Sequence, residues 1–522
     1  MRRNVPIAAN SDSTTTNGGA PEVERARLRA SAATVGAWTA GLAGFVLLCT
    51  TNAAGYRFGA SDQALYIPAV LRHVDPTLFP RDAGLIDTQA RLMLNDEAVA
   101  WLLRATGLSM PHLFIVLYVI TLVLLLTGAV RLGSHFYRTR GAIVSVAAAL
   151  TLRHGIAKTG TNTLEGYFHP RQLAFAFGLL AIVMFIERRD RFALGFLIAA
   201  GVAHTTTFFW FAIWLSVAAW AGRPAYRRTM AILLAIVAAA AAWAIWRGPL
   251  AGRLIRMDAE WLAVIATKDY LFPDEWRWDA WLSNVLTIPV ILVAWRARVR
   301  AGRAFEGEGP IVIGVLALAA VFVCWLPFDA ARLALAVQMQ TSRVFWMLDA
   351  LATFYVVWAL AEGNAPQPQW RAAVIAGVLL VASTARAVYI SRIEFPNRPI
   401  FAIDVEPPEW RDAMAWARAS PGQSGWLADP AHAALYGSSI RAVGQRDVLL
   451  EDLKDAALAI YDRNIAMRIA DRRRALAETS WDTPDGARSL ARRYNLDYLI
   501  TNRPVDLPRV YSAGSLFIYS LR

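Results

Sequence analysis

Long apolar runs separated by short polar segments dominate the pattern of hydrophobic and polar positions along the chain. A helix that crosses a membrane needs roughly 20 mainly apolar residues, and about eleven runs approach this length. They predict membrane helices over the segments 34–51, 110–130, 141–153, 170–187, 192–204, 206–221, 229–246, 280–295, 310–326, 344–361 and 370–390. The third, fifth and sixth are short, so we expect them to be tilted, buried in the bundle or fused with a neighbour.

Residues 391–522 follow a different pattern. The segments 408–420 and 450–476 have the apolar spacing of amphipathic helices, whereas 496–501 and 516–521 are short apolar runs typical of buried strands. No glycine-rich phosphate-binding motif precedes a helix here, so we expect no nucleotide. The sequence therefore predicts an α-helical polytopic membrane protein with a small, soluble α/β domain at its C-terminal end.

Composition and charge support this fold class. Of the 522 residues, 56% are hydrophobic and 20 are tryptophan, and the mean hydropathy is positive. The net charge of +13 would suit nucleic acid, but most basic residues gather in alternate loops, where the positive-inside rule places them. These residues are Arg25, Arg27, Arg29, Arg131, Arg138, Arg140, Arg188, Arg189, Arg191, Arg223, Arg227, Arg228, Arg296, Arg298, Arg300 and Arg303. We therefore expect no nucleic-acid partner, a cytoplasmic N-terminus and an outer location for the residues after 391.

This assignment of the loops to the two sides of the membrane divides the chain into three parts. We expect a disordered cytoplasmic tail over 1–30, a transmembrane domain over 31–390 and an extracytoplasmic domain over 391–522, in a bacterial-type plasma membrane. The first apolar run lacks a signal-cleavage site and reads as a retained span, and the two cysteines, Cys49 and Cys324, indicate no disulfide framework. The long loops all fall on the outer face and are 52–109, 154–169, 247–279 and 327–343. Because elaborated loops on one face usually carry the site, we expect the function to face outward.

A polar stretch, FGASDQALYIPAVLRHVDPTLFPRD over 58–82, directly follows the first span. Ser61 fits a helix N-cap, and Asp62 would then lie in the first turn of a short helix over roughly 62–72, with Tyr66 on its apolar side. An amphipathic helix at the end of a span lies flat at the membrane surface, which would place Asp62 at the mouth of the bundle. The alternative is that Asp62 only complements the helix dipole.

Ionisable residues also crowd the second outer loop. They are His154, Lys158, Glu165, His169 and Arg171. Pro170 is well tolerated at the start of a helix, so Arg171 would project from that start into an outward cavity. Ionisable groups at membrane depth are costly and by default indicate function. The alternative for Arg171 is a side chain that snorkels to the interface.

The remaining candidates lie further along the chain. His204, within a long apolar stretch, either lines a cavity or is a satisfied buried histidine. Arg332 and Arg343 in the fourth outer loop suit a phosphate, because arginine binds phosphate through paired hydrogen bonds; ordinary phospholipid headgroups are the alternative. No second histidine or carboxylate stands at metal-ligand spacing, so the sequence predicts no metal site.

One layout unites these features: a first span, a large outer loop with an early aspartate, many further spans and a soluble outer domain. It resembles the GT-C superfamily of integral membrane glycosyltransferases, which includes protein O-mannosyltransferases, aminoarabinose transferases and oligosaccharyltransferase catalytic subunits. The resemblance covers the whole chain in architecture and rests in motif on Asp62 and the helix after it. Many relatives have two adjacent acids there, whereas this chain has Asp62-Gln63. A second acid from Glu165, Asp75 or Asp82, and a divalent metal, are therefore left open.

The resemblance implies transfer of a sugar from a polyprenyl-phosphate carrier to an envelope glycan, lipid or protein on the outer face. Asp62 would be the base, with Glu165 as the further catalytic acid. Cations would stabilise the departing phosphate, namely Lys158, Arg171, Arg332 and Arg343. His169, His204 and Tyr66 would line the cavity.

Two other functions stay open at this stage. A transporter or flippase of a lipid-linked sugar would also use polar residues in the membrane, although the sequence has no repeat symmetry of the kind common in transporters. A non-catalytic subunit of envelope assembly on a GT-C scaffold would explain the missing second acid.

Overall fold

The computed structural model describes residues 20–364 and 368–522, and the chain forms two compact units, Met1–Phe45 and Val46–Arg522. Helix α1 (Ala20–Asn52) begins in the first unit, so residues 20–30 are helical and not disordered as the sequence suggested. Residues 1–19 of the predicted tail lie outside the described residues. All later elements belong to the second unit.

Each apolar run that the sequence singles out is helical. The run 34–51 is part of α1, and the others are α5 (Met110–Phe136), α6 (Arg140–Leu150), α7 (Pro170–Ile186), α8 (Asp190–Ala203), α9 (Thr205–Gly222), α10 (Arg227–Trp246), α12 (Trp278–Val285) with α13 (Thr287–Arg300), α14 (Glu308–Ala330), α16 (Val344–Ala361) and α17 (Gln369–Tyr389). Seven segments of the described chain are long and apolar enough to cross a membrane: Met110–Phe136, Thr205–Gly222, Pro224–Trp246, Trp278–Arg300, Glu308–Ala330, Ala334–Ala361 and Trp370–Glu394. Helices α6, α7 and α8 are shorter, so the prediction of about eleven crossings is confirmed only for these seven.

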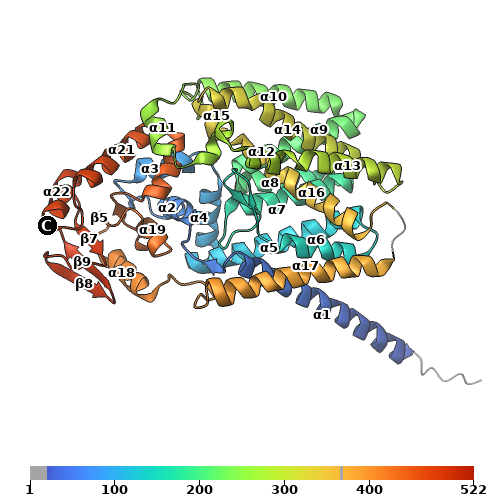
Figure 1. The fold of residues 1–522 in the computed structure, drawn as a ribbon, viewed down its shortest axis with the longest axis horizontal. Coiled ribbons are helices and arrows are strands. Elements are labelled where there is room, and N and C mark those ends of the chain that lie inside the picture. Colours follow the sequence, from blue (N-terminus) through green and yellow to red (C-terminus); the bar gives the residue numbers. More distant parts are fainter. Residues whose placement is uncertain (1–19, 365–367) are drawn as a thin grey trace, which may run out of the picture. The chain divides into compact units, whose positions relative to one another are not determined.

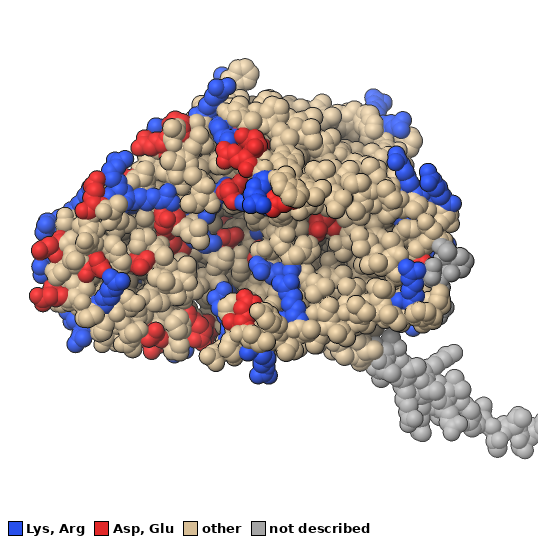
Figure 2. Space-filling model, in the orientation of Figure 1, with Lys and Arg blue, Asp and Glu red and all other residues tan. Residues whose placement is uncertain are grey.

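The bundle contains both enclosed and lipid-facing helices. Helix α7 packs against α5, α8 and α9 and buries most of its side chains, whereas α10 buries none of its residues. Large apolar side chains are exposed along α10, among them Leu234 (68% exposed) and Trp246 (84% exposed). Such a surface is unfavourable in water and suits lipid chains. Figure 2 shows a wide uncharged surface over the bundle.

The first loop assigned to the outer face contains β1 (Tyr56–Arg57), α2 (Gln63–Val74), α3 (Ala83–Ala90) and α4 (Asn95–Thr106). Helix α2 corresponds to the helix predicted over roughly 62–72, with two corrections. Ser61 has a φ of 52°, outside the extended conformation of an N-cap, so Asp62 takes that position and its side chain makes no cap hydrogen bond. Seven of its residues between Gln63 and Val70 are buried, so protein encloses α2 and it does not lie flat at an interface with one face exposed.

The other outer loops contain short elements. The second has the hairpin of β2 (Gly155–Ile156) and β3 (Thr161–Asn162); the third has α11 (Ala259–Ile265), η2 (Asp269–Leu271) and η3 (Pro273–Glu275); the fourth has α15 (Ala334–Met339) and η4 (Thr341–Arg343). After α17, the chain continues through η5 (Ile390–Glu394) to β4 (Phe401–Ala402). Strand β4 pairs in parallel with β1, so the segment after the last bundle helix returns to the first loop.

The C-terminal elements gather around a five-stranded sheet (Figure 1). They are α18 (Pro408–Ala419), β5 (Gly425–Leu427), α19 (His432–Leu435), η6 (Ile440–Gly444), β6 (Asp447–Val448), α20 (Asp452–Leu458), η7 (Ala459–Tyr461), α21 (Arg463–Glu478), α22 (Pro484–Tyr494), β7 (Tyr498–Thr501), β8 (Arg509–Ala513) and β9 (Leu516–Ser520). The strand order is β6-β5-β7-β9-β8, with the first three parallel. The small mixed sheet is confirmed. The helix predicted over 450–476 is divided, because the side chain of Asp462 accepts from the Asn464 N–H and starts α21 as a new helix.

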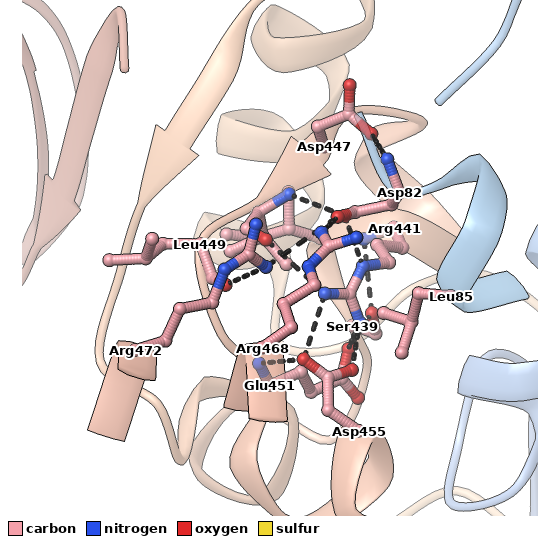
Figure 3. A network of polar contacts seen from close by, with 12 residues as sticks. Asp82, Leu85, Ser439, Arg441, Asp447, Leu449, Glu451, Asp455, Arg468 and Arg472 are labelled. Atoms are coloured by element: carbon pink, nitrogen blue, oxygen red, sulfur yellow. Dashed lines mark hydrogen bonds and ion pairs between the residues drawn. The ribbon is translucent and has the colours of Figure 1, made fainter. Parts of the chain in front are cut away.

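A buried network of charges joins the first loop to the C-terminal elements (Figure 3). Nε of Arg441 donates to Oδ2 of Asp82 at 2.7 Å, and the same guanidinium pairs with both oxygens of Asp455. Arg468 also pairs with Asp82, whose backbone N–H donates to Oδ1 of Asp447 at 3.0 Å. Burial would raise the pKa of Asp82, but Arg441 and its neighbours lower it below its ordinary value. Since buried charges need such partners, the network fixes the first loop against the C-terminal elements.

Candidate active site

Asp62 lies at the start of α2, and its carboxylate contacts two other parts of the chain. Its Oδ1 accepts a hydrogen bond from Nζ of Lys454 at 2.8 Å, and its Oδ2 lies 3.3 Å from Nε2 of His169. Burial would raise the pKa of Asp62, but Lys454 and then His169 outweigh it and hold that pKa well below its ordinary value. The side chain is 32% exposed. Asp62 is therefore an ionised carboxylate that remains accessible, and it does not serve as a simple cap.

His169 orients that carboxylate from the start of α7. Its Nδ1 accepts the backbone N–H of Arg171 at 3.1 Å, so a neutral imidazole carries its proton on Nε2, which faces Asp62. Burial, and then the charge of Arg171, lower the pKa of His169 to about 4. The ring of Tyr66 packs edge-on against the imidazole, with ring centroids 5.4 Å apart. His169 is thus a neutral imidazole at pH 7, with Nε2 close to the carboxylate of Asp62.

Arg171 and Glu165 form a buried ion pair in the same region. Nη2 of Arg171 lies 3.4 Å from Oε1 of Glu165, and the two side chains are 5% and 8% exposed. Nδ2 of Asn162 donates to both carboxylate oxygens of Glu165 at 3.2 and 3.3 Å. Burial raises the pKa of Glu165 against the opposing charge of Arg171, and Asp62 adds to the rise. Glu165 therefore holds Arg171 in place within electrostatic reach of Asp62.

Arg343, the last residue of η4, has no carboxylate partner within the described part of the chain. It lies in electrostatic contact with Arg171, Tyr461, Tyr270 and Tyr66, and its Nε is buried without a hydrogen-bond partner. Of these two neighbouring guanidiniums only Arg171 has a carboxylate partner, so positive charge is left uncompensated in a buried place, which is costly. An anion that both can reach, such as a phosphate, would relieve that cost.

His204 lies beside this group of cations but has a structural partner. Its Nδ1 accepts the backbone N–H of Thr207 at 3.2 Å and so caps α9. Arg343, Arg171 and His169 are all within electrostatic reach of its ring. His204 is thus a satisfied buried histidine close to the candidate site, and the prediction that it lines the cavity stays a prediction.

Two predicted phosphate ligands are engaged elsewhere, by acids of the third outer loop. Lys158 pairs with Asp269, and Arg332 pairs with Asp274 at 2.8 Å and also with Glu275. Neither cation is among the groups that influence Asp62.

The three candidates for a second acid also differ in whether they lie near Asp62. Asp75 is exposed and bonds to Thr77, while Asp82 belongs to the buried network of Arg441, so Glu165 is the candidate within electrostatic reach of Asp62. Gln63, which directly follows Asp62, is fully buried. Its Oε1 accepts the Gly59 N–H at 2.7 Å and its Nε2 donates to the Phe168 carbonyl at 3.1 Å.

Sequence reasoning missed the lysine that contacts Asp62. Lys454 lies 392 residues further along the chain, in a segment recognised only as an amphipathic helix, and nothing in the sequence marks such a distant partner. Lys268 is a further cation of this region. Its Nζ donates to the Leu453 carbonyl at 2.8 Å, and burial and then Lys454 lower its pKa to about 8.

Taken together, these side chains form a positively charged site around one accessible carboxylate. Its cations are Arg171, Arg343, Lys268 and Lys454, and its carboxylates are Asp62 and Glu165. A cavity of about 390 Å³, with Ser61 and Lys454 in its wall, lies next to Asp62. Among the side chains that the structure describes, no three His, Cys, Asp or Glu residues are grouped to hold a metal ion. The arrangement can accept a proton at Asp62 and bind an anion at the arginines.

Comparison with known proteins gives likeness of fold only. No protein-family model matches the chain, and no curated protein matches it by sequence. It is similar to the solved structure of the arabinofuranosyltransferase AftD from Mycobacteria, with a TM-score of 0.47 and 14% identity over 92% of this chain, but spans only 41% of that protein's chain. It is also similar to the archaeal oligosaccharyltransferase AglB from Archaeoglobus fulgidus, with a TM-score of 0.36 and 10% identity over 88% of this chain and 69% of that one.

Proposed function

We propose that this chain is a membrane glycosyltransferase that moves a sugar from a polyprenyl-phosphate carrier to an envelope acceptor on the outer face of the membrane. One observation carries the proposal: the carboxylate of Asp62 is held between His169 and Lys454, in the same site as Arg171 and the unpaired Arg343. A carboxylate can take the proton of an acceptor hydroxyl, and two guanidiniums can bind a phosphate.

Asp62 acts as the base in this scheme. The acceptor oxygen forms a bond to the anomeric carbon, its proton passes to Asp62, and the bond from that carbon to the phosphate oxygen breaks. The electron pair of the broken bond leaves with the phosphate. Because Lys454 and His169 keep the pKa of Asp62 low, its carboxylate is ionised and takes the proton late, when bond formation has made the hydroxyl acidic. Nε2 of His169 lies 3.3 Å from one carboxylate oxygen, and this contact helps to position the carboxylate.

The departing phosphate is stabilised by Arg171 and Arg343. Arg343 has donors that no described side chain uses, and Glu165 holds Arg171 in place from its other side. Preorganised cations in a buried site stabilise developing negative charge more strongly than they would in water. Lys158 and Arg332 would first have to leave their carboxylate partners, so we assign the phosphate to Arg171 and Arg343.

The test is transfer of a labelled sugar from a polyprenyl-phosphate donor in membranes that contain the Asp62→Asn variant. We expect the rate to fall by about 100-fold or more, because a positioned general base contributes at least that much. Asp75→Asn is the matched control: it lies in the same loop, is exposed and bonds only to Thr77, so its rate should stay at the wild-type level.

Two results would contradict the proposal. Undiminished transfer by Asp62→Asn would remove Asp62 as the base. Passage of the labelled carrier across sealed vesicles, with no new glycosidic product from the wild-type chain, would favour a transporter. If the chain is a non-catalytic subunit, neither the wild type nor Asp62→Asn will give product in this assay. Both forms should then support envelope assembly equally.

A further inference from the structure

Two cavities adjoin where the first outer loop meets the segment after the last bundle helix. The cavity of about 420 Å³ has Arg57, Arg398, Asp404 and Glu406 in its wall, and the cavity of about 390 Å³ has Ser61, Glu451 and Lys454. Arg57, Ala434 and Gly437 line both. The two cavities therefore adjoin through a shared wall. Together they extend from residues 395–399, after α17 and η5, to the surroundings of Asp62, and we call this pair of cavities the groove.

Backbone pairing builds the wall that carries the two arginines. The Tyr56 N–H donates to the Ile400 carbonyl at 2.7 Å, and the Phe58 N–H donates to the Ala402 carbonyl at 3.1 Å. Nη1 of Arg398 donates to the Ala54 carbonyl at 3.4 Å, across 344 residues of sequence, and its guanidinium lies over the ring of Phe395 at 3.7 Å. Arg57 and Arg398 are thus held by regular pairing and stacking.

Neither arginine forms an ion pair with a carboxylate among the described side chains. Glu394 lies within electrostatic reach of Arg398, and Asp404 and Glu406 line the same cavity. Burial, and then the charge of Arg398, lower the pKa of Arg57, as expected for two cations that face each other. Two guanidiniums in one cavity suit a phosphate, which accepts paired hydrogen bonds from each.

The other end of the groove presents oxygen acceptors. Glu451 is 1% exposed, and its Oε1 has no hydrogen-bond partner although Glu451 lines the cavity next to Asp62. An unpaired buried acceptor is costly, and a hydroxyl group of a ligand would satisfy it. Asp404 and Glu406 offer further acceptors for hydroxyls near the arginines.

We propose that this groove binds the acceptor, and that the acceptor is a glycan bearing a phosphate group. The phosphate binds to Arg57 and Arg398, and the hydroxylated sugar extends past Glu451 to Asp62. The role as acceptor rests on the proposed function, whereas the phosphate site does not. The phosphate belongs either to a lipid headgroup or to a soluble phosphorylated glycan, since both present the same group to the arginines.

The phosphate site is tested by binding to the full chain in detergent. The Arg343→Gln background removes an arginine of the carrier site, and dodecyl phosphate, glucose 1-phosphate and inorganic phosphate are the probes. We expect binding in this background, weakened about 10- to 100-fold by Arg57→Gln or by Arg398→Gln, because each removes charge-assisted hydrogen bonds. Arg392→Gln is the control, since Arg392 is exposed in η5 and lines neither cavity.

Each outcome of these binding measurements has one interpretation. Tight binding of dodecyl phosphate alone assigns the phosphate to a lipid, and equal binding of glucose 1-phosphate assigns it to a soluble glycan. Unchanged affinity in both arginine variants, or equal loss in Arg392→Gln, overturns the phosphate site; if Arg57→Gln does not fold, Arg398→Gln decides. In the transfer assay, Arg57→Gln should raise KM for the acceptor and spare kcat. If Asp62→Asn keeps full transfer while the arginine variants lose phosphate binding, the base assignment fails and the groove stands.

Discussion

Asp62 carries its negative charge in a site crowded with cations, and Lys454 is the strongest of the influences that keep it ionised. Replacing Lys454 with glutamine removes that influence while burial remains, so the pKa of Asp62 should rise. With Asp62 as the base, the acidic limb of the pH–rate profile should then move to higher pH. Lys454→Arg keeps the charge and should leave the limb near its wild-type position. If the acidic limb of the pH–rate profile does not move in Lys454→Gln, the pKa of Asp62 does not set that limb.

The buried carboxyl group of Glu451 should make the stability of the folded chain depend on pH. Burial raises its pKa to about 7 against the opposing charge of Arg441, from an ordinary value of 4.5. The folded state therefore holds this proton to higher pH than the unfolded state does, so the stabilisation is complete below pH 4.5 and is lost as pH rises to about 7. The shift corresponds to roughly 3 kcal/mol.

The measurement is the unfolding midpoint of the detergent-solubilised chain between pH 4.5 and 7. Glu451→Gln resembles the protonated form, so its midpoint should fall less with rising pH than that of the wild type. Glu478→Gln, at an exposed position of α21, should follow the wild type. Parallel curves for Glu451→Gln and the wild type would mean that Glu451 titrates alike in both states.

At the scale of elements, one buried ion pair joins α13 to α14. Nε and Nη2 of Arg298 bond to the two oxygens of Glu308 at 2.7 and 3.0 Å, both side chains are fully buried, and the Tyr355 hydroxyl donates to Glu308 at 3.0 Å. Glu308→Ala leaves Arg298 buried without its partner and should destabilise the chain by about 3–5 kcal/mol. The readout is the thermal unfolding midpoint in detergent.

The exposed pair of Arg188 and Glu306 supplies the control for that experiment. Its side chains are 60% and 84% exposed, so Glu306→Ala should change stability by less than about 1 kcal/mol. A double change of Arg298 and Glu308 to apolar residues should recover much of the loss, since no unpaired charge remains. Equal effects of Glu308→Ala and Glu306→Ala would contradict the assigned role of the buried pair.

The sequence predicts elements better than it predicts their contacts. Apolar runs located every bundle helix, because a span must be continuous and apolar whatever surrounds it. The same runs fixed neither the number of full crossings nor the burial of α2, which depends on the C-terminal elements that cover it. The sequence singles out Asp62, His169 and Arg171 because charges beside spans are conspicuous. Lys454 lies on an ordinary charged helix and reaches Asp62 only by tertiary contact.

At the scale of the whole second unit, contacts between loops follow the alternation that the charges predict. Loops assigned to the outer face contact one another and the C-terminal elements, through Lys158–Asp269, Arg332–Asp274, Asp258–Arg463 and Asp62–Lys454. Loops assigned to the cytoplasm form a second set, through Arg131–Glu187, Arg188–Glu306, Arg298 with the Phe136 carbonyl, and Arg138 with Glu362. The two sets do not mix in these contacts, so we expect the short helices α6, α7 and α8 to connect opposite ends of the bundle.

This alternation leads to a prediction for topology. Since the second set contains most of the clustered arginines, the positive-inside rule assigns it to the cytoplasm, and the site around Asp62 then faces outward. A reporter active only outside the membrane, fused after Arg392, should therefore be active, and the same reporter in the loop at Arg303 should be silent. A cytoplasmic location of the reporter fused after Arg392 would mean that the orientation of the bundle is the reverse of the predicted one. It would place Asp62 and the arginines on the side where a carrier-linked sugar facing outward could not reach them.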